Sequence, residues 1–231
     1  MTDLPPRLPG PSGRLSGGPG PSGRLSGGPG PSGRLSGEPG PVAVLVPVKS
    51  FGEAKVRLSP ALDPADRAEL ARVMATHVEQ TAAPLPVADV SDAAEDAAWA
   101  RDLGALVVWE PERGLNRAVE AGVARLAADG ARRVVVAHAD LPQARAGRLA
   151  SVARFDGVTI VPDHRDNGTN VICVPGYARF TFSYGPGSFA RHAAEAHQLG
   201  LPLRVVREPS LSHDVDSPAD LLEYRLLAAH P

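Results

Sequence analysis

The segment VVVAHADLP, Val134 to Pro142, decides the fold, because an apolar run is followed at once by a carboxylate. Short apolar runs rich in β-branched residues are typical of buried strands. In open α/β sheets, ligands bind outside the carboxyl ends of the strands. If the flanking sequence builds such a sheet, Asp140 lies at its ligand-binding edge. The alternative is a surface aspartate that begins a turn before Pro142.

Strand and helix patterns alternate on both sides of this segment. The predicted strands cover residues 42–48, 84–90, 105–110, 131–140, 157–163, 169–175 and 203–208. The predicted helices cover residues 63–82, 92–104, 114–130, 143–155, 187–199 and 217–229. This alternation predicts a mostly parallel sheet with right-handed crossovers and helices on both faces, which is a three-layer α/β/α sandwich.

The first 41 residues differ in kind from the rest of the chain. The decapeptide PGPSGRLSGG occupies residues 9–18 and recurs at 19–28 and, with Glu38 in place of the last glycine, at 29–38. Each repeat offers too little apolar surface to offset the entropy lost on ordering. We therefore expect a disordered tail, residues 1–41, followed by one domain, residues 42–231. The alternative is a weakly basic tether that contacts a partner through its three repeated arginines.

Composition excludes several classes of partner. The formal net charge is −2 and no basic patch stands out, which argues against binding to nucleic acid or to an anionic membrane surface. No apolar segment approaches the length of a membrane helix, and the N-terminus lacks the apolar centre of a secretion signal. The single cysteine, Cys173, excludes a disulfide framework. We expect a cytoplasmic protein.

The segment HDVDSP, residues 213–218, carries a second chemical signal. Asp214 and Asp216 are two residues apart, so in an extended chain their side chains leave the same face. Two neighbouring negative charges need a cation or a shared proton, and Mg²⁺ suits a few carboxylates combined with substrate phosphates. With Asp140 they make three carboxylates for one or two magnesium ions. Taken alone, Asp216 also fits an ordinary helix entry before Ser-Pro.

The loop after the first strand, VKSFGEAKVRL, contains three cations, Lys49, Lys55 and Arg57. Cations at the ligand-binding edge neutralise phosphates and complement metal ions in charge, so we predict that this loop faces the phosphates of a ligand. A solvated basic loop is the alternative. The loop has no GxxxxGK[ST] sequence, which excludes a P-loop NTPase.

Two turns have the character of small-ligand cradles. DNGTN, residues 166–170, places Thr169 just before a strand, and SYGPGS, residues 183–188, places Gly185 and Ser188 at a helix start. Backbone amides at a helix N-terminus bind anions. For each segment taken alone, an ordinary turn is the commoner explanation. The segment DHRD, residues 163–166, has no recognised metal-ligand spacing, so we expect a solvated loop there.

Taken together, these segments resemble one family over residues 42–231. They are VPVK, AKVRL, GLNRA, ADLP, VPDHRDNGTN, YGPGS and DVDSPADL. In order and spacing they look like the guanylyltransferases of coenzyme F420 biosynthesis. The resemblance implies the nucleotide-diphospho-sugar transferase type of α/β/α sandwich and a possible homodimer.

The resemblance also implies roles for individual residues. Asp140, Asp214 and Asp216 would hold Mg²⁺. Thr169, Gly185 and Ser188 would contact the acceptor acid. The loop cations Lys49, Lys55 and Arg57 would face the GTP phosphates, with Asn116 near the nucleoside, and Lys49 and Asp140 would carry the catalysis.

The implied reaction condenses GTP with phosphoenolpyruvate, giving enolpyruvoyl-2-diphospho-5'-guanosine and pyrophosphate. Alternative acceptors are 2-phospho-L-lactate and 3-phosphoglycerate. The sequence also allows a nucleotidyltransferase of the same fold acting on a sugar phosphate or molybdopterin, and a non-catalytic nucleotide-binding protein with a partner-recruiting tail. The acceptor phosphate is already ionised near neutral pH, so His138, His192 and His213 are predicted not to be catalytic bases.

The sequence departs from the family at two places. Asp166 and Asn167 replace the first two residues of the usual Gly-Thr-Gly-Thr-Asn acceptor loop, and PVADVSD lacks the usual Thr-Asp-Asp.

Overall fold

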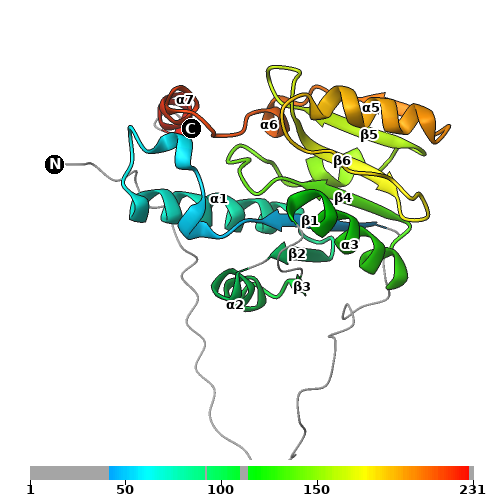
Figure 1. The fold of residues 1–231 in the computed structure, drawn as a ribbon, viewed down its shortest axis with the longest axis horizontal. Coiled ribbons are helices and arrows are strands. Elements are labelled where there is room, and N and C mark those ends of the chain that lie inside the picture. The colour runs from blue at the N-terminus through cyan, green and yellow to red at the C-terminus, as the bar shows by residue number, and fades with distance from the viewer. Residues whose placement is uncertain (1–41, 92, 110–113, 229–231) are drawn as a thin grey trace, which may run out of the picture.

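A computed structural model describes residues 42–91, 93–109 and 114–228 (Figure 1). The strands are β1 (Val42–Val48), β2 (Val87–Ser91), β3 (Leu106–Trp109), β4 (Arg133–Ala137), β5 (Val158–Pro162), β6 (Thr169–Pro175) and β7 (Leu203–Val205). The helices are η1 (Phe51–Glu53), η2 (Val56–Leu58), α1 (Pro64–Ala82), α2 (Ala94–Asp102), α3 (Gly114–Ala128), α4 (Arg148–Val152), α5 (Ser188–Gln198), α6 (Pro209–Ser212) and α7 (Pro218–Ala228). The predicted tail, residues 1–41, lies outside the described residues.

The seven strands form one sheet in the order β3-β2-β1-β4-β6-β5-β7. Strands β1 to β4 are parallel, as are β5 and β7, whereas β6 is antiparallel to both β4 and β5. The mostly parallel sheet is confirmed. The reversal of β6 follows from the short connection after β5, since a parallel neighbour needs a crossover of a dozen or more residues. Pro162 pairs with Thr169, so Thr169 lies at the carboxyl end of β5.

Alternate residues of β1 point to two separate hydrophobic cores, which makes the domain three-layered (Figure 1). Val44, Val46 and Val48 pack in the core that contains residues of α1 and α4. Ala43 and Leu45 pack in the core that contains residues of α3 and α5. The α/β/α sandwich predicted from the alternation is therefore correct.

Several predicted boundaries are confirmed and others are wrong; the strand predicted for residues 131–140, for example, ends at Ala137. Asp63 caps α1, because its carboxylate accepts a hydrogen bond from the Asp66 N–H at 2.8 Å. The helix predicted for residues 143–155 is confined to α4, which begins only after Gly147, whose φ of +78° is left-handed. The strand predicted for residues 203–208 ends at Val205, and Pro209 begins the short helix α6 instead.

The last helix returns across the domain to the loop after β1. Leu58 in that loop, Met74 in α1, and Val215 and Leu221 next to and within α7 form a third, smaller core. Figure 1 shows α7 beside the segment that follows β1. This packing brings residues 214–216 over the cations of that segment. Among the described helices, none is long and apolar enough to span a membrane.

Candidate active site

A cleft of about 760 Å³ opens at the carboxyl ends of β1, β2 and β4, a size suited to a small-molecule ligand. Its walls come from the loop after β1, the end of β2, the start of α3 and the segment after β4. The lining residues include Val48, Lys49, Lys55, Arg57, Val90, Ser91, Leu115, Ala118, His138, Asp140 and Asp216. The cleft therefore lies at the predicted edge of the sheet.

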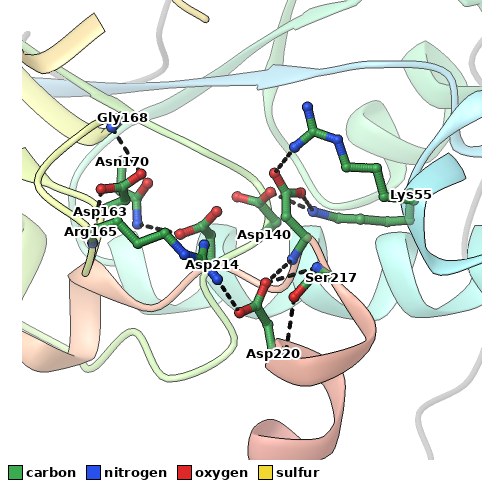
Figure 2. Close-up of polar contacts among 11 residues, drawn as sticks. Lys55, Asp140, Asp163, Arg165, Gly168, Asn170, Asp214, Ser217 and Asp220 are labelled. Carbon is green, nitrogen blue, oxygen red and sulfur yellow. Dashed lines mark hydrogen bonds and ion pairs between the residues drawn. The ribbon is translucent and has the colours of Figure 1, made fainter. Parts of the chain in front are cut away.

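Three carboxylates meet at one end of this cleft. Asp140 follows β4, and Asp214 and Asp216 lie between α6 and α7; each offers an oxygen, and these oxygens lie within 4.8 Å of one another. Figure 2 shows the carboxylates of Asp140 and Asp214 side by side. The structure thus brings together the three aspartates that the sequence singled out.

This carboxylate triad fits a magnesium ion. All its donors are oxygens, which is the ligand type that Mg²⁺ prefers. Asp140 Oδ1 is buried and has no hydrogen-bond partner among the described residues. Burial raises the pKa of Asp214, and the negative charge of Asp140 raises it further. A cation bound beside Asp214 would therefore stabilise its ionised form.

Lys55 is the cation nearest the triad. Its Nζ donates hydrogen bonds to Asp140 Oδ2 and, at 2.8 Å, to Asp216 Oδ1, and its side chain is 9% exposed. Burial acts to lower the pKa of Lys55, but the two carboxylates raise it above its ordinary value. Burial likewise acts to raise the pKa of Asp140, yet the Lys55 charge holds it below the usual range. Both groups are therefore charged at neutral pH.

The other two predicted cations lie further out. Arg57 NH1 is 3.6 Å from Asp216 Oδ2, with a largely exposed side chain. Lys49 lines the cleft but pairs with Glu53 at 3.9 Å rather than with the triad. Two of the three cations thus contact the triad and the third faces the cleft.

The two predicted acceptor segments are joined by His192. Its Nδ1 lies 3.0 Å from the buried Thr169 Oγ1, and its Nε2 accepts a hydrogen bond from the Ser183 N–H at 2.9 Å. Gly185 has a left-handed φ of +112°, and Ser188 begins α5 with a buried side chain. These residues do not line the 760 Å³ cleft, but they reach the triad through Asn170, whose Nδ2 donates to Asp214 Oδ1 at 3.2 Å.

Residues 42–229 match the family model described as guanylyl transferase CofC like. The chain belongs to this family. Its curated relatives include two proteins named phosphoenolpyruvate guanylyltransferase. The protein from Roseiflexus castenholzii is 35% identical, and the match covers 77% of this chain and 85% of the relative. The protein from Sphaerobacter thermophilus is also 35% identical, and the match covers 80% of this chain and 92% of the relative. The Conexibacter woesei protein of the same name is 36% identical over 80% and 87%.

Solved structures place the fold of this CofC-like chain among the nucleotidyltransferases. A Desulfovibrio desulfuricans chain assigned as a nucleotide-diphospho-sugar transferase superposes with a TM-score of 0.69 at 18% identity, covering 80% of this chain and 87% of its own. A nucleotidyl transferase from Methanothermobacter gives 0.61 at 15% identity, covering 81% and 97%. At these identities the likeness concerns the fold alone.

Within the CofC-like site, Asn116 makes an internal contact. Its Oδ1 accepts a hydrogen bond from the Tyr184 N–H at 2.7 Å, which ties the first turn of α3 to the loop before α5. Its neighbours Leu115 and Ala118 line the cleft, whereas Asn116 itself does not. Its role near the nucleoside stays a prediction.

The loop of residues 163–168, which overlaps the predicted acceptor segment 166–170 and is here called the acceptor loop, is held by hydrogen bonds to one aspartate. The Asp163 carboxylate accepts hydrogen bonds from the N–H groups of Arg165, Asn167 and Gly168 at 2.8–3.0 Å. An aspartate that bonds the backbone ahead of it is the signature of an Asx turn, and this signal was present in DHRDNG. Residues 164–167 are exposed, as expected of a solvated loop, and the Asp163 hydrogen bonds fix their backbone.

The two residues that depart from the CofC-like pattern have visible structural roles. Asp166 has a left-handed φ of 54°, which aspartate tolerates better than most residues, and both its oxygens accept hydrogen bonds from Arg207. Asn167 Oδ1 accepts a hydrogen bond from the Gly187 N–H at 3.1 Å. Asn167 thereby joins the acceptor loop to the start of α5.

Proposed function

We propose that this protein transfers the guanylyl group of GTP to phosphoenolpyruvate, giving enolpyruvoyl-2-diphospho-5'-guanosine and pyrophosphate in coenzyme F420 biosynthesis. The observation that carries the proposal is the convergence of Asp140, Asp214 and Asp216, two of which bind Lys55, beside a nucleotide-sized cleft. The names of the curated relatives support phosphoenolpyruvate as the acceptor.

In this proposal the triad holds Mg²⁺, which when bound supplies positive charge to the phosphates as negative charge develops on them. Lys49, Lys55 and Arg57 bind the triphosphate, because all three line the cleft beside the triad. Preorganised cations of this kind stabilise charge in the transition state without reorganisation. Asn116 acts near the nucleoside by holding the first turn of α3, whose neighbouring residues Leu115 and Ala118 line the cleft.

Thr169, Gly185 and Ser188 bind the acceptor in the proposed reaction. A phosphate oxygen of the acceptor attacks the α-phosphorus of GTP, and the bond from that phosphorus to the bridging oxygen breaks as pyrophosphate leaves. The attacking phosphate is already ionised near neutral pH, so no residue has to remove its proton. His192 is instead a structural group, since burial lowers its pKa to about 4 and it is neutral at pH 7.

The test is an assay of pyrophosphate release with Mg²⁺, GTP and one acid at a time. The acids are phosphoenolpyruvate, 2-phospho-L-lactate and 3-phosphoglycerate, and we expect phosphoenolpyruvate to have the highest kcat/KM. A higher value for another acid would change the acceptor while keeping the guanylyltransferase. Release with none of them would favour a non-catalytic nucleotide-binding protein.

We further propose a cytoplasmic homodimer with residues 42–231 as its folded domain. Helix α7 leaves Leu222 61% exposed and Leu227 49% exposed, apolar surface suited to a protein contact. Light scattering at micromolar concentration distinguishes a dimer from a monomer.

A further inference from the structure

Asp220 is a buried acid behind the triad rather than in it. It lies in the first turn of α7 and is 8% exposed. Its Oδ2 accepts hydrogen bonds from the N–H groups of Asp216 at 3.1 Å and Ser217 at 2.8 Å, as Figure 2 shows for Ser217. Asp220 therefore fixes the backbone of the segment that carries two of the three triad carboxylates.

The other oxygen of Asp220 binds a residue of the acceptor loop. Arg165 NH2 donates to Asp220 Oδ1 at 2.8 Å across 55 residues of sequence (Figure 2). The Arg165 N–H donates to Asp163 Oδ1, and Asp163 Oδ2 accepts from the Gly168 N–H, next to Thr169. One continuous set of hydrogen bonds thus runs from the triad segment to Gly168, the residue directly before β6.

The electrostatics favour an ionised pair. Both carboxylate oxygens of the buried Asp220 accept hydrogen bonds, Oδ2 from two backbone N–H groups and Oδ1 from the Arg165 guanidinium. Charge-assisted hydrogen bonds are about twice as strong as neutral ones. The Arg165–Asp220 contact is therefore suited to fixing the distance between two loops that share no secondary structure.

The same loop carries a second ion pair that serves as a comparison. Arg207 binds Asp166 at 3.0 Å, with side chains 63% and 49% exposed. Among the described residues, its hydrogen bonds and ion pairs go to Asp166 and not to the triad segment. This pair stabilises the acceptor loop without linking it to the carboxylates.

We propose that Arg165 and Asp220 are a positioning pair for the phospho-acid acceptor of the reaction proposed above. They hold the acceptor loop at a fixed distance from the triad, so that the acceptor phosphate meets the α-phosphorus of GTP. Misplacement of a reactant by about 1 Å can cost on the order of 100-fold in rate, so a contact that fixes the distance between the two loops affects the reaction. Neither residue is assigned a contact with the reacting atoms.

Steady-state kinetics of the full-length protein with Mg²⁺, GTP and phosphoenolpyruvate test the pair. We expect R165M to raise the KM for phosphoenolpyruvate roughly tenfold or more, with the KM for GTP unchanged within about twofold. R165K should recover most of the loss, because the contact with Asp220 is a single hydrogen bond that an ammonium can make. The control R207M should lose less than about twofold in either KM.

A double-mutant cycle separates positioning from general damage. R165M combined with D220N should cost less than the product of the two single losses, because both changes remove one interaction. Circular dichroism follows the folding of each variant, and if D220N does not fold, R165M and R165K still decide. If R165M leaves the KM for phosphoenolpyruvate unchanged, or if R207M raises it as much as R165M does, the positioning role is refuted. The proposed function is unaffected by that result as long as the wild type turns over. Absence of turnover in the wild type would instead refute the proposed function.

Discussion

The Lys55 ammonium binds two carboxylates of the triad, so a divalent cation has to compete with it for those oxygens. Its Nζ contacts Asp140 and Asp216 in the free protein. We predict that K55M binds Mn²⁺ about tenfold more tightly than wild type in the absence of GTP, because a competing charge is removed. The measurement is calorimetric or spin-resonance titration with Mn²⁺. K49M, at an exposed lysine paired with Glu53, should leave the affinity unchanged, and weaker binding by K55M would contradict the competition.

Asp140 is the triad member with a buried oxygen that no described residue satisfies. We predict that D140N lowers turnover on the order of 100-fold or more. The neutral amide of asparagine binds a metal ion and the Lys55 ammonium more weakly than the aspartate carboxylate does. Circular dichroism should show a folded protein. E53Q is the matched control, since Glu53 also lines the cleft and, among the described residues, its carboxylate pairs with the exposed Lys49 and not with the triad. A near-normal rate in D140N would refute the assignment of Asp140 as a ligand of the catalytic metal ion.

Among the secondary-structure elements, β6 and α5 are joined by one buried ring, that of His192. Its pKa is lowered by burial to about 4, whereas an unfolded histidine titrates near 6.5. The unfolded state therefore binds more protons between these values, and stability falls as pH drops from about 6.5 to 4.

We predict that wild type loses about 3 kcal/mol more unfolding free energy than H192Q over this interval, by the value of 1.36 kcal/mol per pKa unit. Urea unfolding at several pH values measures the difference. H197Q, at an exposed histidine of the same helix, should keep the wild-type pH dependence. Parallel curves for wild type and H192Q would show that the ring is not the titrating group.

The elements also show what the sequence was able to specify. The start of α1 was predictable because Asp63 and Pro64 are local signals. The reversal of β6 was also predictable, because the connection between the predicted strands 157–163 and 169–175 is too short for a parallel crossover. The triad was predicted from its residue types, whereas the Arg165–Asp220 contact joins positions 55 residues apart and carries no local pattern.

Across the whole molecule, the sheet order explains how two substrates meet. Strand β4 lies between β1, whose loop supplies the cations, and β6, whose first residue belongs to the proposed acceptor site. Asp140 follows β4 and so lies between the two halves. Helix α7 closes the arrangement, because its packing on the loop after β1 brings Asp214 and Asp216 to the same place.

The same architecture predicts which part of the chain is needed. Both the family match and the first strand begin at Val42. We predict that deleting residues 1–41 changes the melting temperature by less than about 2 °C, which corresponds to under about 1 kcal/mol, and kcat/KM by less than about twofold. A deletion of residues 1–48 removes β1, which pairs with both β2 and β4, and should yield no folded protein. A large loss of activity in the shorter deletion would give the repeats a part in the function and extend the domain beyond residues 42–231.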